Sequence, residues 1–316
     1  MLPTHRTHDR YRHEALLWQG HDEFLAGTLP FILEGVHAGQ PVLAAVVPER
    51  VELLQRALGS DADQVRFADM TELGANPARI IPAWRRFTEE HAAGGHPVRG
   101  IGEPIWSGRR PAELVECQLH EALLNQAVEQ DTPLWLLCPY DVENLTPDVV
   151  AEAHRSHPVV VEVEHHRGST LYRGTHHAGT IFEADLPAVD VAVSHRVLGR
   201  ADLAVVREDV IAHGVSAGLG PERGEELALA VHEVTVNSLE HGSGHGVLRI
   251  WHEDDALIFE VRDQGRIADP MVGRRTPQWD DERGRGLWMA NQLCDLVQIR
   301  SSPEAGTAVR VHARLI

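Results

Sequence analysis

The 316-residue chain contains no lysine, so all 29 of its lysine-or-arginine positions are arginine. This absence excludes a P-loop NTPase, because its phosphate-binding loop needs a lysine. It also excludes any enzyme that forms a Schiff base through lysine. Acidic residues outnumber the arginines, and the net charge is −18. Because binding to nucleic acid needs clustered cations that neutralise phosphate, the composition argues against direct nucleic-acid partners.

Cysteine is also scarce, with Cys117, Cys138 and Cys294 as the three examples. An odd, sparse set without C-x-x-C spacing is typical of reduced core thiols. The first ten residues lack the apolar region of a signal peptide, and no apolar run approaches the ~18 residues that a membrane span needs. We therefore expect a cytoplasmic protein without a membrane partner.

The most informative stretch is residues 221–242, where apolar residues recur at helical spacing and predict a helix with one buried face. Glu233 and Asn237 lie four residues apart, so their side chains share a face. A carboxylate can accept a proton from a nucleophile, and an amide oxygen can ligate Mg²⁺. Taken alone, such a pair is more typical of an exposed amphipathic helix.

Further motifs follow this helix in a fixed order. A strand-like run ends in Asp263–Gly265, and a polar loop with prolines occupies residues 266–283. Gly284–Gly286 then opens a helix, where free N–H groups and the helix dipole favour phosphate. A closing strand carries Gly306–Thr307.

In order and spacing these motifs resemble the GHKL ATP-binding fold, and above all the bacterial anti-sigma serine kinases of the RsbW and SpoIIAB kind. The resemblance covers about residues 186–316 and implies a histidine-kinase-like ATPase domain. The fold it implies is an α+β two-layer sandwich of the Bergerat type, with ATP and Mg²⁺ as cofactors. The expected strands are residues 189–193, 247–252, 257–262, 296–300 and 308–315, and the expected helices are 203–217, 221–240 and 287–293.

The resemblance also implies a role for each matching residue. Glu233 matches the general base that accepts a proton from a serine hydroxyl of the partner, and Asn237 matches the Mg²⁺ ligand. The nucleotide contacts are Asp263, Gly265 and Thr307 around adenine, Gly284 and Gly286 at the phosphates, and Arg274 and Arg275 in the lid, residues 266–283. Ile267 departs from the family, because it replaces the second glycine of D-x-G-x-G. A β-branched residue resists conformations that glycine permits, so we expect a stiffer or displaced lid hinge.

In the first half, short apolar runs alternate with longer amphipathic ones. The expected strands are residues 15–18, 41–47, 64–67, 97–101 and 134–138, and the expected helices are 23–38, 50–58, 77–93, 111–130 and 148–154. This alternation predicts a doubly wound α/β domain with a mostly parallel sheet. In such sheets, ligands bind beyond the carboxyl ends of the strands.

This half resembles the MEDS sensory domain over residues 11–157, through His13–Leu17, Gly39–Leu43 and the closing Leu137–Asp141. The resemblance implies a sensor for an unknown small ligand or signal. No G-x-x-x-x-G-K-[ST] motif is present, so a second ATPase is not expected. The candidate ligand contacts near the strand ends are His13, Glu103, Trp106, Cys138, Tyr140 and Asp141.

Several of these side chains also have simpler explanations. His13 fits a half-buried strand histidine, and Cys138 fits a core thiol. Glu116 and His120 share a helical face, and without a third ligand an exposed face is favoured over a metal pair.

Residues 158–185 are expected to connect the first domain to the ATPase domain, residues 186–316. The histidines around this connector are expected to be solvated loop residues: His157, His165, His166, His176 and His177. The connector has no room for a dimerising helical hairpin with a phospho-acceptor histidine, so a true histidine kinase is not expected.

Two functional hypotheses remain open. The first is a signalling regulator in transcription whose ATPase domain is a serine/threonine protein kinase, a transferase of the anti-sigma-factor type. The second is a non-catalytic, ATP-dependent binding module that sequesters its partner. Glu233 and Asn237 favour the kinase, whereas Ile267 favours the binding module. The expected partners are a sigma factor, an anti-anti-sigma antagonist or both, with a homodimer as a further option.

Overall fold

The computed structural model describes residues 10–92, 97–162, 165–189, 194–242, 244–253, 255–278 and 284–315. The chain divides into two compact units, Met1–His177 and Ala178–Ile316. The division falls inside the short helix α7 (His177–Phe182).

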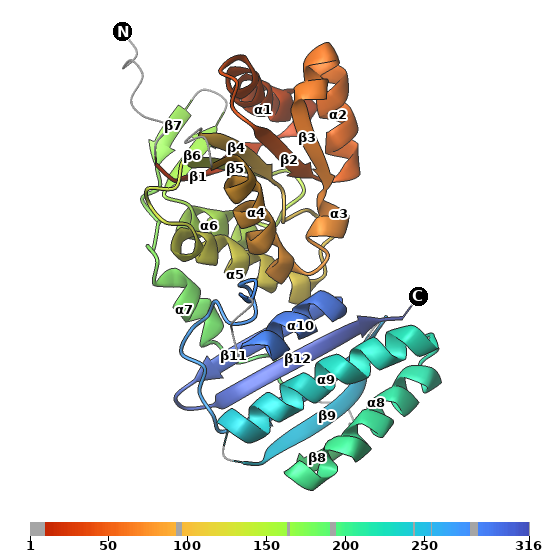
Figure 1. The fold of residues 1–316 in the computed structure, drawn as a ribbon. Coiled ribbons are helices and arrows are strands. Elements are labelled where there is room, and N and C mark those ends of the chain that lie inside the picture. Colours follow the sequence, from red (N-terminus) through yellow and green to blue (C-terminus); the bar gives the residue numbers. More distant parts are fainter. Residues whose placement is uncertain are drawn as a thin grey trace. The chain divides into compact units, whose positions relative to one another are not determined.

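The first unit is built on a seven-stranded sheet in the order β3-β2-β4-β5-β1-β6-β7 (Figure 1). The strands are β1 (Arg12–Trp18), β2 (Val42–Val46), β3 (Val65–Asp69), β4 (Val98–Gly102), β5 (Leu134–Asp141), β6 (Val159–Glu162) and β7 (His165–Gly168). Strands β1 to β6 pair in parallel, and β7 is antiparallel to β6. The near-continuous apolar runs of β2 and β5 are buried, as a parallel sheet covered on both faces requires. The predicted fold class is confirmed.

Helices cover both faces of this sheet. They are α1 (Gly20–His37), α2 (Pro48–Leu58), α3 (Met70–Leu73), α4 (Ile80–Ala92), α5 (Pro111–Ala127) and α6 (Pro147–Ser156), with 3₁₀ turns η1 (Gly59–Gln64) and η2 (Pro77–Arg79). Helices α1 and α2 pack on the face that carries Leu16 and Trp18 of β1. The opposite face meets α4, where the Trp84 ring lies against Gly100, and also α5 and α6 (Figure 1).

The segment predicted as a connector differs from expectation at its start. Residues 159–162 form β6, which pairs with β1 through Glu14–Leu16, and residues 165–168 add β7 at the sheet edge. The sequence pattern does not reveal β7, because this strand is polar and four residues long. The first unit therefore extends beyond residue 157.

The second unit has a five-stranded sheet in the order β11-β12-β10-β9-β8, and every pair is antiparallel among the described residues. Its elements are β8 (Ser194–Leu198), η3 (Arg200–Asp202), α8 (Leu203–Ser216), α9 (Pro221–His241), β9 (Gly246–Glu253), β10 (Ala256–Asp263), α10 (Arg285–Leu293), β11 (Leu296–Ser302) and β12 (Gly306–Arg314). The strand expected at residues 189–193 falls mostly outside the described residues. The two-layer α+β class is confirmed.

Helix α9 is the central helix of this unit and packs against α8, α10 and the sheet (Figure 1). It begins at Pro221, the first-turn position where a missing N–H costs nothing. Leu227, Val231 and Val234 are buried along one stripe, as the helical spacing predicted. That stripe fixes the rotation of α9 and turns Glu233 and Asn237 toward α10.

The face of the second sheet away from these helices carries a buried ion network. Glu260 accepts hydrogen bonds from Arg262 at 2.8 Å and from Arg310 at 2.6 Å. Burial raises the pKa of Glu260, but the two arginines outweigh burial and lower it below its ordinary value. Arg310 also donates to the carbonyl oxygen of Pro187, which ties the entering chain to the sheet.

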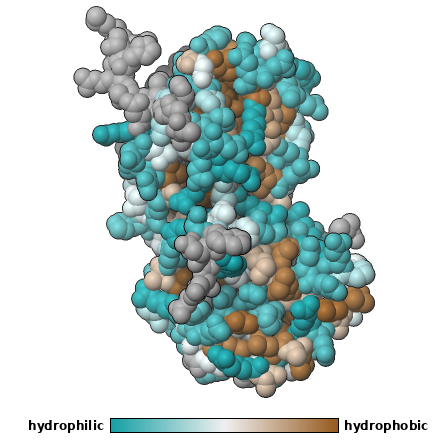
Figure 2. Space-filling model, viewed as in Figure 1, coloured by the Kyte–Doolittle hydropathy of each residue, from teal (hydrophilic) through white to brown (hydrophobic). Residues whose placement is uncertain are grey.

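Hydrophilic residues cover much of the visible face of each unit, and hydrophobic residues form smaller groups between them (Figure 2). Among the described residues, no helix combines the length and apolar character that crossing a membrane requires.

Candidate functional site

The second unit contains a cavity of about 720 Å³ between α9, the ends of β10 and β12, and the segment after β10. Six of the residues predicted for the nucleotide site line it: Asn237, Asp263, Gly265, Arg275, Gly284 and Thr307. They come from positions spread over about 70 residues of sequence and meet around one space. The volume lies within the ~300–1,000 Å³ of small-molecule sites.

One end of the site is the contact between α9 and α10. Glu233 and Asn237 are half-buried and lie one turn apart on α9. A Cβ atom on Gly286 would lie 2.8 Å from Glu233 Oε2 and 3.0 Å from Asn237 Nδ2. Gly286, in the first turn of α10, therefore lies against both side chains, and a larger residue there would have to displace at least one of them. The structure therefore brings together Glu233, the predicted base, Asn237, the predicted metal ligand, and Gly286, the glycine predicted to contact phosphate.

Gly284 precedes α10 in the left-handed conformation, with φ of +87°. Glycine adopts this conformation without strain, so the chain can turn sharply from the cavity wall into the helix. The N–H groups at the start of α10 have no partners within the helix, and the helix dipole makes this end positive. Phosphate is the anion class that such an end favours.

The other end of the cavity is held by hydrogen bonds among Asp263, Gly265 and Thr307. Asp263 closes β10 opposite Thr307 of β12. The Gly265 N–H donates to Asp263 Oδ1 at 2.6 Å, and Thr307 Oγ1 donates to the Gly265 carbonyl at 2.9 Å. A Cβ on Gly265 would lie 2.7 Å from the His241 carbonyl oxygen, so the chain passes too close for another residue. These contacts fix the Asp263 carboxylate at the cavity wall.

Residues 266–277 supply most of the remaining wall, and 279–283 lie outside the described residues. The Ile267 N–H donates to Ser301 Oγ at 2.9 Å, which ties the start of the lid to β11. Met271 is buried, and the Asn291 side chain donates to the Gly273 carbonyl at 3.0 Å. The described part of the lid is thus more firmly attached to the unit than its polar sequence suggested.

The two lid arginines lie in different places. Arg275 lines the cavity and forms an ion pair with Asp269. Arg274 is buried and is not among the residues that line the cavity. A phosphate contact from Arg274 stays a prediction that would need the lid to rearrange.

In the first unit, Glu103 and Asp141 lie where expected, at the carboxyl ends of β4 and β5. Glu103 Oε2 accepts a hydrogen bond from the Val47 N–H at 3.1 Å, and Arg50 lies 3.7 Å from Asp141. Burial raises the pKa of Glu103 to about 7, although the Val47 hydrogen bond and Arg50 oppose the shift. Trp106 follows β4, with the Arg109 guanidinium stacked 3.8 Å from its ring.

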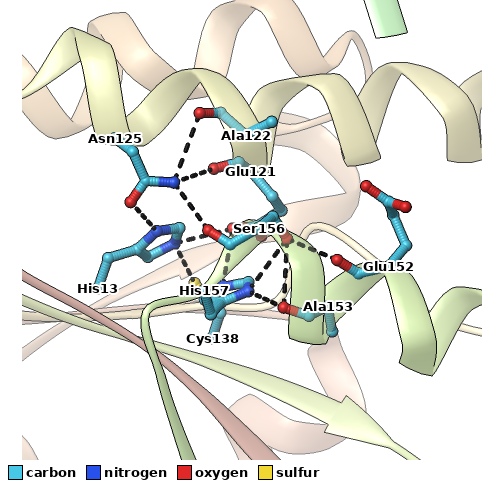
Figure 3. A network of polar contacts seen from close by, with 9 residues as sticks. All are labelled: His13, Glu121, Ala122, Asn125, Cys138, Glu152, Ala153, Ser156 and His157. Atoms are coloured by element: carbon cyan, nitrogen blue, oxygen red, sulfur yellow. Dashed lines mark hydrogen bonds and ion pairs between the residues drawn. The ribbon is translucent and has the colours of Figure 1, made fainter. Parts of the chain in front are cut away.

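His13 and Cys138 lie away from the carboxyl ends of their strands, and Tyr140, next to the end of β5, has a buried side chain. His13 is near the start of β1, and all three side chains are buried on the face of the sheet that α5 and α6 cover. His13 Nε2 lies 3.0 Å from Glu121 of α5 and 3.5 Å from Cys138 Sγ (Figure 3). Burial lowers the pKa of His13, and His157 adds to this effect. Burial also raises the pKa of the Cys138 thiol.

The comparisons with known proteins assign the two halves separately. Residues 12–158 match the family described as the methanogen/methylotroph, DcmR sensory domain, MEDS. Residues 200–313 match the family described as the histidine kinase-like ATPase domain. The chain joins a MEDS domain to a histidine kinase-like ATPase domain. A sensory domain followed by an ATPase domain is the organisation of a signalling regulator, and ATP is the ligand that the second family implies for the cavity.

Among solved structures, one similar chain contains the RsbU and RsbW domains of Rv1364c from Mycobacterium tuberculosis. The match has 21% identity and a TM-score of 0.30, and it covers 40% of this chain and 33% of the other. The match thus spans about a third of the length of that solved chain. Among curated proteins, none matches the chain.

Three buried polar residues of the MEDS domain were missed or misjudged from sequence. Glu121 and Asn125 lie on α5, and His157 follows α6. All three contact the side chain of His13.

The burial of several polar side chains was also misjudged. His157 was expected as a solvated loop histidine, but it is fully buried, and His177 is buried too. Glu116 and His120 were expected on an exposed face and are also buried, because α5 packs against α4, α6 and η2. The signal was the i, i+4 pair of Glu121 and Asn125 on a helix whose polar residues are spread around it and do not form one face.

Proposed function

We propose that the protein is an ATP-dependent serine/threonine protein kinase of the anti-sigma-factor type, governed by its N-terminal sensory domain. The observation that carries the proposal is the contact of Gly286 with both Glu233 and Asn237, of which Asn237 lines the cavity. Adenine would bind at the other end of the cavity, against Asp263 and Thr307. With adenine there, the terminal phosphate would arrive near the Glu233 carboxylate and the Asn237 amide oxygen.

Each residue would have a defined task. The amide oxygen of Asn237 would hold Mg²⁺, which would neutralise charge on the phosphates when bound. Glu233 would accept the proton of a serine hydroxyl on the partner protein. At the same time the serine oxygen would form a bond to the γ-phosphorus. The bond from that phosphorus to the β–γ bridging oxygen would break, and ADP would leave with the electron pair.

The test compares three variants of α9 in the full chain, incubated with labelled ATP, Mg²⁺ and candidate antagonist proteins. Glu233→Gln should keep ATP binding and lose phosphoryl transfer by about 10²–10⁴-fold, the usual contribution of a general base. Asn237→Ala should weaken Mg-ATP binding by about 1–3 kcal/mol, measured by calorimetry. The exposed Glu240→Gln on the same helix is the matched control and should change neither property.

Two outcomes would contradict these roles. Normal transfer by Glu233→Gln would remove it as the base, and unchanged Mg-ATP affinity in Asn237→Ala would remove it as the metal ligand.

The alternative is a module that binds ATP and captures a partner without phosphoryl transfer. Ile267 favours it, because its N–H is bound to Ser301 and its side chain lines the cavity where the family has a glycine hinge. Wild-type protein that binds Mg-ATP and a partner, yet transfers no label, would support this alternative over the kinase.

A further inference from the structure

The MEDS domain contains a cluster of four buried side chains that the ATPase site does not involve. His13 comes from β1, Glu121 from α5, Cys138 from β5 and His157 from the residue after α6 (Figure 3). Their exposed fractions are 2%, 0%, 1% and 0%. One nitrogen, oxygen or sulfur atom from each lies within 4.8 Å of all the others.

Hydrogen bonds on the outer side of the two imidazoles determine which ring nitrogen carries hydrogen. Asn125 Nδ2 lies 2.7 Å from the Ser156 carbonyl oxygen, so the amide group must donate there and turn its oxygen toward His13. His13 Nδ1, 3.2 Å from that oxygen, must therefore donate. His157 Nδ1 must likewise donate to the Ala153 carbonyl at 2.8 Å. Both neutral rings consequently carry a lone pair on Nε2.

These two lone pairs are directed at the same carboxylate. Glu121 Oε2 is 3.0 Å from His13 Nε2 and 3.2 Å from His157 Nε2. Among the described residues, Glu121 Oε1 has no hydrogen-bond partner, and the group nearest to His157 Nε2 is the Glu121 carboxylate. Acceptors that face one another out of water are unfavourable unless a cation lies between them. The cluster is thus complementary to a positive charge at its centre.

Three of the six separations among these atoms are close to those in the coordination shell of a small transition-metal ion. In a tetrahedral zinc site with bonds of about 2.0–2.3 Å, neighbouring N and O ligands lie about 3.3 Å apart, and N and S ligands about 3.6 Å apart. The corresponding separations here are 3.0 and 3.2 Å to Glu121 Oε2, and 3.5 Å from His13 Nε2 to Cys138 Sγ. Imidazole and thiolate select zinc and its neighbours over Mg²⁺ or Ca²⁺, which prefer oxygen.

We propose that the MEDS domain binds one divalent transition-metal ion, with Zn²⁺ as the best fit, through His13 Nε2, Glu121, Cys138 Sγ and His157 Nε2. One carboxylate and one thiolate neutralise the two positive charges, so the loaded site is uncharged as a whole. Asn125 and the Ala153 carbonyl hold the two imidazoles in the ligating tautomer, as outer partners of metal-bound histidines do. The ion would link β1, β5, α5 and the end of α6, and the domain would be more stable with it.

The first measurement is the metal content and cobalt spectrum of the full chain. Protein purified with zinc and then dialysed should retain about one equivalent. Cobalt exchanged into the site should show a sulfur-to-metal charge-transfer band in the near ultraviolet. Cys138→Ser should abolish that band and lower zinc affinity by about 100-fold or more, and Asn125→Ala should lower it by about 10–100-fold.

The matched control is Cys117→Ser, a second buried cysteine of the same domain whose thiol donates to the Pro104 carbonyl oxygen at 3.2 Å. It should keep the cobalt band and the zinc equivalent. If Cys138→Ser does not fold, the cobalt spectrum of the wild-type chain and of Cys117→Ser still decides the question.

Three results would overturn the proposal: a wild-type chain that retains no zinc, a cobalt spectrum without the sulfur band, or equal zinc affinity in Cys138→Ser and Cys117→Ser. The first would leave an imidazolium ion paired with Glu121 as the explanation of the cluster. Equal zinc affinity in the two cysteine variants would mean that any bound zinc is held by surface histidines.

Discussion

At the scale of single residues, the surroundings of a side chain are set by one local motif in the ATPase cavity and by distant segments in the buried cluster of the MEDS domain. Asp263, Gly265 and Thr307 belong to motifs at the ends of adjacent strands, so their meeting followed from the fold class. His13 and Glu121 are separated by 108 positions, and nothing in their local sequence shows that α5 covers β1. The tautomers of the two histidines depend on Asn125 and a helix carbonyl, which only the folded chain brings into place.

Glu103 gives a prediction at this scale, because its pKa is about 7 in the folded protein against an ordinary 4.5. Between these values the folded state keeps a proton that the unfolded state releases. The contribution of Glu103 to stability is therefore present below about pH 4.5 and lost as the pH rises through about 7, by up to about 3 kcal/mol.

Glu103→Gln should remove this loss, since glutamine does not titrate. The free energy of unfolding should be measured by denaturant from pH 5 to 8 for the wild type, Glu103→Gln and the exposed control Glu52→Gln. The wild type and the control should lose stability relative to Glu103→Gln as the pH rises. Parallel curves for all three would show that Glu103 titrates normally.

At the scale of elements, periodicity predicted most helices and strands, and errors gathered at their ends. Helix α9 was expected at residues 221–240 and spans Pro221–His241, because a buried stripe and a proline start define it. Strands β6 and β7 were harder, since they are four residues long and depend on pairing with β1. The attachment of the lid depends on Ser301 and Asn291, which belong to elements downstream of it.

The contact between α9 and α10 can be tested with Gly286→Ala. The added Cβ would lie 2.8 Å from Glu233 Oε2 and 3.0 Å from Asn237 Nδ2, so at least one of these side chains must move. We expect Mg-ATP affinity to fall about tenfold and phosphoryl transfer, where present, to fall further. Gly224→Ala is the control, because a Cβ there meets no atom of the described residues within 4 Å and Gly224 lies in α9 with Glu233 and Asn237.

That control should raise the melting temperature, since alanine favours a helix by about 0.5–1 kcal/mol, and leave Mg-ATP binding unchanged. Equal nucleotide affinity in Gly286→Ala and the wild type would show that α10 does not form part of the phosphate site.

At the scale of the whole molecule, each unit has its own sheet and its own buried residues, so each is expected to fold alone. A fragment of residues 10–177 should melt cooperatively, and Mg-ATP should not shift its melting temperature. A fragment of residues 178–316 should melt at a higher temperature with Mg-ATP, because a ligand stabilises the state that binds it. A shift in the first fragment would reveal a nucleotide site in the MEDS domain.

The full chain then tests whether the sensory domain governs the ATPase domain. Linkage is reciprocal, so if occupation of the MEDS domain changes Mg-ATP affinity, Mg-ATP must change affinity in the MEDS domain by the same factor, typically about 5–150-fold. We therefore expect Mg-ATP to shift the melting transition of the MEDS domain in the full chain but not in the 10–177 fragment. The MEDS melting transition could instead be identical with and without Mg-ATP in the full chain and in the fragment. The two domains would then not share a conformational equilibrium, and a signal between them would have to pass through a separate partner protein.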